Sequence, residues 1–309
     1  MQTKSGVKLG IAVPQGFADG RVDMPLVRRF VARAEALGYD DLWVAEQITG
    51  TIASLEPVGL LAYVAALTER VRIGASVFVS TLRNPVQFAK ALGTLDHLSE
   101  GRLTVGLGLG TNTRKYPAYR LAEERRVARF TEGVRIMKAL WTQDAADYEG
   151  SWATLSGVKM EPKPVQKPHP PLWFGARAPD ALQRTARLAD GWMGAGSSTN
   201  EAFIREHNEL MGMLEEEGRD PATFGVSKRV YLAIDTDEAR GWAGLREWIG
   251  GFYGNPDLAE QWSIVGSADY IAEKLAELVE AGANHLLLNP VHNYIEHLEV
   301  IAEEVAPRI

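Results

Sequence analysis

The side chains that carry covalent or metal chemistry are scarce in this sequence. It contains no cysteine, which excludes thiol nucleophiles, disulfides and thiolate metal ligands. No HExxH motif, closely spaced histidine pair or G-x-S-x-G elbow is present, so neither zinc-dependent hydrolysis nor serine-dependent acyl transfer is indicated. His285 and His292 stand on either side of an expected strand, but single histidines are more often structural than ligands. The sequence therefore predicts no metal site.

Three runs of small residues are the strongest chemical feature that remains. Each run follows a short β-like segment: Gly108-Leu109-Gly110-Thr111, Gly175-Ala176 and Gly194-Ala195-Gly196-Ser197-Ser198. Small residues before a helix leave backbone N–H groups free near the positive end of the helix dipole, which suits a phosphate. Because the protein offers few acids or bases at these positions, we expect a phosphate-bearing cofactor to supply the difficult chemistry.

The elements that position these runs alternate regularly along the chain. Strands are expected over residues 7–13, 41–45, 72–79, 102–109, 172–174, 191–194, 230–234 and 285–288. Helices are expected over residues 24–37, 56–68, 85–98, 122–141, 179–188, 200–217, 268–280 and 294–305. This alternation predicts an α/β fold, a (β/α)8 TIM barrel. A doubly wound open sheet fits less well, because its glycine fingerprint would follow the first strand rather than the fourth.

Two segments interrupt the alternation within what we expect to be a single domain over residues 1–309. Residues 142–171 contain five prolines and two turn signals, which predict a β-hairpin and an extended connector after the fourth helix. Residues 236–265, after the seventh strand, are rich in Trp and Gly and predict a helical insertion. The aromatic residues of this insertion either belong to the core or close a pocket. These residues are Trp242, Trp248, Phe252 and Tyr253.

In a (β/α)8 barrel the ligand site lies at the carboxyl ends of the strands. Glu46 and Gln47 follow the second expected strand, and Asn112 follows the fourth. Glu46 is the best placed carboxylate to polarise or orient a bound group, although a structural hydrogen bond to a neighbouring loop is an equal alternative. Arg177 either reaches a phosphate or stays solvated. The catalytic candidates are therefore Glu46, Gln47 and Asn112.

The composition is that of an acidic globular chain. With 46% hydrophobic and 24% charged residues, 309 residues are enough to bury a large core. A net charge of -7 provides no basic field for nucleic acid or an anionic membrane. The segment before Pro14 is too poor in apolar residues for a signal peptide, and no run is long enough for a membrane span. We expect a soluble, cytoplasmic protein that acts on a small molecule.

An ordered set of segments resembles the luciferase-like monooxygenase superfamily. The segments include LGYDDLWVAEQ, RVRIGASVFVSTLRNPVQFAKALGTLDHLSEGRLTVGLGLG, PKPVQKPHPPLWFGA and VGSADYIAEKLAELVEAGANHLLLNP, and the set spans nearly the whole chain. Members of this family use reduced FMN or the deazaflavin coenzyme F420. The resemblance implies a (β/α)8 barrel with an insertion after the fourth helix, one of these two cofactors, and a homodimer.

Two positions favour the deazaflavin-using branch. Many F420-dependent relatives have a non-proline cis peptide bond at the end of the third strand, where it backs the cofactor ring, and the matching bond here is Ser76–Val77. In luciferase-type FMN enzymes an arginine between the last two glycines of the fourth strand helps to bind the phosphate, whereas this chain has Leu109. We therefore expect coenzyme F420, with FMN as the alternative. The expected cofactor-binding residues are Ser76, Val77, Gly108, Leu109, Gly110, Thr111, Gly175, Ala176, Arg177, Gly194, Ala195, Gly196 and Ser197.

Two departures argue against kinship in activity with the F420-dependent glucose-6-phosphate dehydrogenases. Where those enzymes have an Asp-His pair after the second strand, this chain has Glu46-Gln47, and Thr111 replaces an acidic residue. Neither Gln47 nor Thr111 titrates near neutral pH. The resulting hypothesis is hydride transfer between C5 of the deazaflavin and a small organic substrate. An FMNH2-dependent monooxygenase that activates O2 and a non-catalytic flavin-binding barrel stay open as alternatives.

Overall fold

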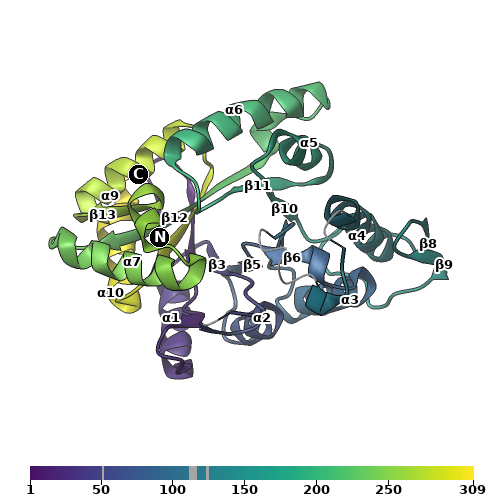
Figure 1. The fold of residues 1–309 in the computed structure, drawn as a ribbon, viewed down its shortest axis with the longest axis horizontal. Coiled ribbons are helices and arrows are strands. Elements are labelled where there is room, and N and C mark those ends of the chain that lie inside the picture. Colours follow the sequence, from purple (N-terminus) through teal and green to yellow (C-terminus); the bar gives the residue numbers. More distant parts are fainter. Residues whose placement is uncertain (51, 111–116, 123–124) are drawn as a thin grey trace.

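The parallel strands of this chain close into a ring. The computed structural model describes residues 1–50, 52–110, 117–122 and 125–309. Within these residues the ring consists of eight strands: β1 (Lys8–Ala12), β3 (Asp41–Val44), β5 (Arg72–Ala75), β7 (Leu103–Gly108), β10 (Leu172–Gly175), β11 (Gly191–Gly194), β12 (Gly225–Ile234) and β14 (His285–Pro290). The ring is closed because β10 pairs with both β7 and β11, as Figure 1 shows. The expected (β/α)8 barrel is confirmed.

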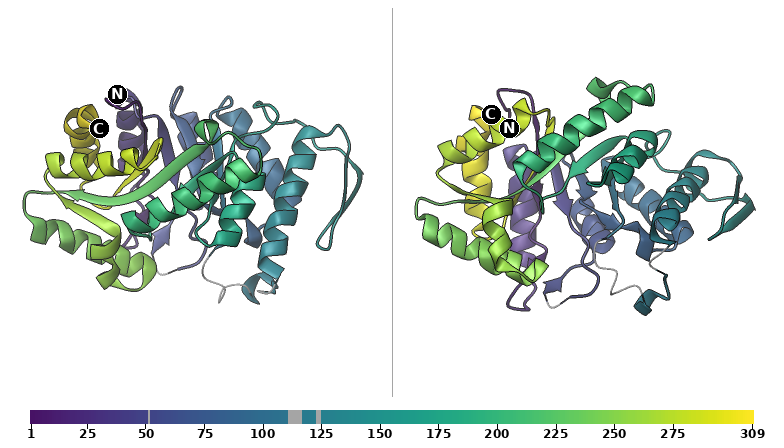
Figure 2. Two further views of the ribbon diagram at one scale, coloured as in Figure 1. Left: turned by 90° about the horizontal axis from the view of Figure 1, so that it is seen from above. Right: turned by 45° about the horizontal axis from the view of Figure 1, so that its top comes forward.

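Helices cover the outside of this ring (Figure 1). They are α1 (Met24–Leu37), α2 (Pro57–Ala66), α3 (Pro85–Leu98), α4 (Arg126–Thr142), α5 (Pro179–Leu188), α6 (Asn200–Glu216), α9 (Ala268–Glu280) and α10 (Tyr294–Val300), which continues as a π-helical turn over Ile301–Val305. The start of α3 illustrates the local control, because the Asn84 side chain accepts the N–H groups of Val86 and Gln87 ahead of Pro85. The two chain ends lie side by side (Figure 2), where the Ser5 N–H donates to the Ile309 carbonyl at 3.0 Å.

Three element boundaries differ from the sequence expectation. The strand expected over 72–79 is interrupted after Ala75 and resumes as β6 (Phe78–Val79). The fourth helix begins at Arg126 rather than at residue 122. β12 begins at Gly225 rather than at residue 230. The first half of β12 was not predicted because it contains consecutive polar residues and lacks the apolar pattern of a buried strand. Its side chains point alternately into the barrel and toward the helices, and polar groups are bound on both sides.

The two insertions lie where the sequence placed them. The first contains the antiparallel hairpin of β8 (Ala146–Glu149) and β9 (Thr154–Val158), which projects beyond α4 (Figures 1 and 2). The second contains α7 (Glu238–Tyr253) and the short helix α8 (Ala259–Trp262). The sequence predicted a helical insertion, but part of it is a strand: β13 (Ser263–Gly266) pairs in parallel with the end of β12. The ten-residue β12 is long enough to pair with β14 and with β13.

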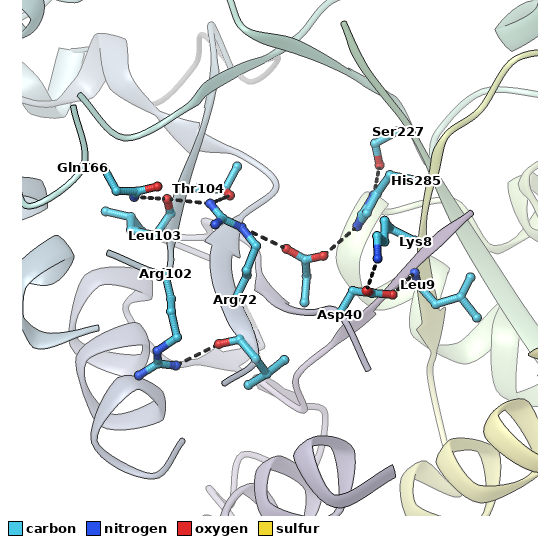
Figure 3. Close-up of polar contacts among 12 residues, drawn as sticks. Lys8, Leu9, Asp40, Arg72, Arg102, Leu103, Thr104, Gln166, Ser227 and His285 are labelled. Atoms are coloured by element: carbon cyan, nitrogen blue, oxygen red, sulfur yellow. Dashed lines mark hydrogen bonds and ion pairs between the residues drawn. The ribbon is translucent and has the colours of Figure 1, made fainter. Parts of the chain in front are cut away.

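A network of polar side chains links strands at the amino-terminal end of the barrel (Figure 3). The Nδ1 atom of His285 lies 2.7 Å from Ser227 Oγ, and its Nε2 atom lies 3.4 Å from a carboxylate oxygen of Asp41. The Arg72 guanidinium donates to Thr104 Oγ1 at 2.9 Å. His285 is only 3% exposed, so it acts as a structural residue between strands. The candidate site is therefore sought at the opposite end, where the carboxyl ends of the strands lie.

His297 connects α10 to the end of β12 and makes the stability of the fold depend on pH. Its Nε2 accepts the Ile234 N–H at 2.8 Å and its Nδ1 faces the Asn293 carbonyl at 3.1 Å. Burial lowers the pKa of His297 below its ordinary value of 6.5, although the bond to Asn293 opposes this. The unfolded chain therefore binds more protons than the folded chain as the pH falls through 6.5, which favours unfolding.

We expect the free energy of unfolding to decrease between pH 7.5 and pH 5.5. The loss attributable to His297 is at most about 1.4 kcal/mol for each pH unit below 6.5. Urea denaturation at a series of pH values measures this loss. His297→Gln removes the titrating ring and should make the pH dependence shallower, and an unchanged slope in the variant would contradict the assignment.

Candidate functional site

A bulge between β5 and β6 marks the carboxyl end of the third barrel strand. The Ser76–Val77 peptide bond within it is cis, as expected from the resemblance. Beyond the bulge, β6 pairs with the end of β7, with Val79 opposite Gly108. The bulge therefore lies directly beside the glycine run of the fourth strand.

Three glycines in and just after β7 leave room for this bulge and for the ends of β5 and β6 beside it. A Cβ atom on Gly106 would lie 1.9 Å from the Ala75 carbonyl oxygen, and one on Gly108 would lie 2.5 Å from Val77 Cγ2. One on Gly110 would lie 2.6 Å from Val79 Cγ1. Crowding by neighbouring protein groups therefore accounts for all three glycines, and a contact of Gly108 and Gly110 with a cofactor stays a prediction. Alternate glycines leave room for alternate residues of the neighbouring strand.

Val77 is the side chain that connects the bulge to the fifth strand. Its Cγ1 atom would be 3.2 Å from a Cβ on Gly175, at the end of β10. Val77 also packs against a buried cluster inside the barrel that includes Trp43 and Met193. The expected cofactor-binding residues Val77, Gly108 and Gly175 thus lie together.

Glu46 holds the bulge rather than standing free in the site. Its carboxylate accepts the Val79 N–H and the Arg83 guanidinium, whose Nε lies 3.0 Å away. The Glu46 side chain is 1% exposed, and Arg83 also pairs with Glu56 at 2.8 Å. Glu46 and Glu56 raise the pKa of Arg83 against the effect of burial. This geometry corresponds to the structural alternative for Glu46, so we treat it as a positioning residue.

Gln47, the neighbouring candidate, has a free acceptor. Its Oε1 atom is buried and has no hydrogen-bond partner among the described residues. Gln15 has a different role, because its side-chain amide bonds to Ala45 and to the Leu55 carbonyl and is fully used. A buried acceptor without a donor carries a free-energy cost unless a bound group supplies the donor. Gln47 is therefore the better candidate for contact with a ligand.

The small-residue loops after β10 and β11 face one another. Arg177 donates to the Ser197 carbonyl at 3.2 Å and to Glu206 at 3.1 Å. The Ala176 carbonyl accepts the Trp192 indole N–H at 2.9 Å. The structure thus brings the second and third predicted runs together, while Thr111 and Asn112 lie outside the described residues.

Two basic residues of β12 were missed by the sequence interpretation. Lys228 is 2% exposed and contacts the loop after β11. Arg229 points into the barrel, where its guanidinium donates to the Ser76 carbonyl at 2.9 Å and to Asn289 Oδ1. The sequence feature that could have revealed them is the charged pair Lys228-Arg229 directly before the apolar run of a strand. Burying such charges costs free energy unless each one has partners.

The aromatic residues of α7 cover the barrel beside Arg229. Trp248 stacks on Phe252 with ring centroids 4.6 Å apart, and both line a cavity of about 30 Å³. Among the described residues around this cavity, Arg229 alone carries a charge. Trp242 and Trp248 also pack against buried Tyr231 and Leu245. The aromatic insertion therefore belongs partly to a core and partly to the wall of the site.

Two kinds of feature are lacking in the parts of the chain that the structure describes. No group of three or more His, Asp or Glu side chains there is arranged to hold a metal ion. No helix in those parts is long and apolar enough to cross a membrane.

The fold and site define a (β/α)8 barrel with a bulged third strand and small-residue loops at its carboxyl face. The model of the family described as luciferase-like monooxygenase matches residues 6–262. The chain belongs to this family.

Curated and solved relatives agree with this placement. An uncharacterised protein of Mycobacterium tuberculosis (strain ATCC 25618 / H37Rv) is 38% identical over 229 residues, covering 72% of this chain and 77% of that protein. The F420-dependent glucose-6-phosphate dehydrogenase of Amycolatopsis mediterranei (strain U-32) is 25% identical, covering 91% of this chain and 93% of the enzyme. A solved F420-dependent secondary alcohol dehydrogenase, in complex with an F420-acetone adduct, superposes with a TM-score of 0.85 at 19% identity, covering 99% of this chain and 98% of that one. At 19% identity, the similarity to this solved dehydrogenase shows a shared fold only.

Proposed function

We propose that this protein is an F420-dependent oxidoreductase that transfers a hydride between C5 of the deazaflavin and a small organic substrate. The observation that carries the proposal is the bulge at Ser76–Val77, where the Val77 side chain lies beside Gly175 and packs against Met193, just before the Gly194–Ser197 loop. The matched F420-dependent dehydrogenase, which covers 91% of this chain, supports the choice of cofactor. Leu109, where luciferase-type FMN enzymes carry an arginine, supports it independently.

The residues present fit such a cofactor. The Gly194–Ser197 loop has carbonyls bound by Lys228 and Arg177, which leaves backbone N–H groups on its other side for a phosphate. Gln47 supplies a buried acceptor without a donor. When bound, the deazaflavin would supply the hydride-transferring carbon. The protein would bind the ring against the bulge, and the aromatic residues of α7 would limit the access of water.

We do not extend the sugar-phosphate activity of the relatives to this chain. Gln47 cannot act as an acid or base near neutral pH. The Glu46 carboxylate is occupied by Arg83 and by the Val79 N–H. A substrate that needs no strong protein base for its proton, such as a carbonyl, an imine or an activated alkene, fits these residues better.

One observation favours the FMN alternative. Arg177 stands beside the Gly194–Ser197 loop with 48% of its side chain exposed, so it could supply the phosphate contact that Leu109 lacks. In that case the protein would be an FMNH2-dependent monooxygenase that activates O2.

We also propose that residues 1–309 fold as one domain and that the protein is a cytoplasmic homodimer. The family resemblance supports the dimer. Size-exclusion chromatography with light scattering measures the mass, which should be twice the chain mass of 33.9 kDa. A monomer at micromolar concentration would contradict this proposal.

Fluorescence titration of cofactor-free protein tests the cofactor assignment. We expect micromolar or tighter binding of F420 and none of FMN, whether oxidised or reduced. Selective binding of reduced FMN would overturn the proposal in favour of the monooxygenase. Tight F420 binding without turnover of the reduced cofactor, over a panel of carbonyls, imines and activated alkenes, would support the non-catalytic alternative instead.

A further inference from the structure

Lys228 is a buried cation at the outer side of β12. Its ammonium group donates to the Ala195 carbonyl at 2.6 Å, the Ser198 carbonyl at 2.9 Å and Ser198 Oγ at 2.9 Å. Three acceptors match the three N–H groups of an ammonium ion. A neutral amine would turn a lone pair toward an oxygen, so this geometry fits a charged anchor and not a nucleophile.

A second cation holds the same loop. Arg177 donates to the Ser197 carbonyl and pairs with Glu206, which is 4% exposed. The carbonyls of residues 195, 197 and 198 are thus all bound to cations. In a trans peptide unit the carbonyl and the following N–H point in opposite directions. The N–H groups of Gly196, Ser198 and Thr199 therefore point away from the cation that the preceding carbonyl binds.

These contacts suggest a role for Lys228 in cofactor binding, and this role rests on the function proposed above. We propose that Lys228 is a positioning residue that, together with Arg177, orients the loop from Gly194 to Ser198 so that its N–H groups bind the phosphate ester of the cofactor. Lys228 acts through the backbone without touching the phosphate. A single buried charge would thereby control the affinity of the site for phosphate esters.

The surroundings of Lys228 make this control sensitive to pH. Burial lowers the pKa of Lys228 to about 7, with Glu206 opposing the change and Arg177 adding to it. The Phe203 ring of α6 packs 6.0 Å from the ammonium nitrogen. Lys228 also lines a groove of about 420 Å³ whose other charged residues lie on α6, β12, α8 and α9. These residues are Glu201, Arg229, Glu260, Lys274 and Glu277.

The contacts of Lys228 determine whether the affinity for the cofactor rises or falls with pH. As the pH rises through 7, Lys228 loses a proton and one of its three N–H donors. The loop then loses a charge-assisted hydrogen bond, and the affinity for the cofactor should fall. A bond of this kind corresponds to a change of about tenfold or more in a dissociation constant.

The test compares Lys228→Met, Lys228→Arg and the control Lys274→Met, which removes a half-buried lysine that lines the same groove. Hydrogen–deuterium exchange of the cofactor-free protein reports the loop directly. We expect faster exchange over residues 194–200 in Lys228→Met and wild-type exchange in the control. Cofactor titrations from pH 6.5 to 8.5 should show an affinity that falls with pH in the wild type. Lys228→Arg stays charged throughout and should bind with little pH dependence.

The outcomes separate this proposal from the cofactor assignment. Wild-type exchange and affinity in Lys228→Met would overturn the positioning role, and so would a pH-independent wild-type affinity. If Lys228→Met does not fold, the comparison of Lys228→Arg with the wild type still decides, because equal pH dependence in the two would overturn the proposal. If the wild type binds neither F420 nor FMN, the proposed function fails, whereas the exchange result still reports whether Lys228 holds the loop.

Discussion

Arg83→Met should lower the free energy of unfolding by about 3–5 kcal/mol, the usual cost of leaving a buried charge without its partner. The Glu46 side chain is 1% exposed and the Arg83 side chain is 19% exposed. After the substitution, the Glu46 carboxylate would keep the Val79 N–H but lose its counter-charge. Urea denaturation at pH 7 measures the loss.

The control for this variant is a solvent-exposed ion pair. Arg33 and Glu299 form a bond of 2.9 Å with 42% of each side chain exposed. Arg33→Met should therefore cost less than about 1 kcal/mol. Similar losses in Arg33→Met and Arg83→Met would show that the Glu46–Arg83 pair does not hold the bulge. The same variants, titrated with cofactor, show whether the bulge must be held for binding.

Gly106→Ala should destabilise the protein more than Gly108→Ala, although each adds one methyl group. At position 106 the added Cβ would meet the Ala75 carbonyl oxygen at 1.9 Å, and this backbone atom cannot move without shifting β5. At position 108 it would meet Val77 Cγ2 at 2.5 Å, at the end of a side chain. We expect a loss of about 1–3 kcal/mol for Gly108→Ala, and a loss at or beyond the top of that range for Gly106→Ala.

A second substitution distinguishes the two clashes. Val77→Ala should recover part of the stability lost in Gly108→Ala, because it removes the atom that is met there, and recover nothing in Gly106→Ala. The control is Gly212 in α6, where an added Cβ would have no neighbour within 4 Å. Gly212→Ala should stabilise the protein by about 0.5–1 kcal/mol. Equal recovery in the two backgrounds would contradict the assignment of the clashes.

Both predictions concern residues whose partners are distant in the sequence. The resemblance correctly anticipated the cis bond at Ser76–Val77, but the partners of Glu46 and the neighbours of the glycines were not visible. Glu46 and Arg83 are 37 positions apart, and Arg229 reaches the Ser76 carbonyl across 153 positions. No spacing rule connects residues so far apart.

The sequence by itself determined the order and type of nearly all elements, because strand alternation, helix periodicity and caps such as Asn84-Pro85 depend on neighbours within a few residues. It also determined the family, through segments spread along the chain. The tertiary structure decided which polar groups stay available. In the folded chain the Glu46 carboxylate binds Arg83, and the bulge occupies the space beside the β7 glycines. Lys228 binds the loop after β11, whereas Arg229 points into the barrel. The reason is physical: hydrogen-bond partners of buried charges are set by which strands become neighbours in the barrel, and that is decided only when the ring closes.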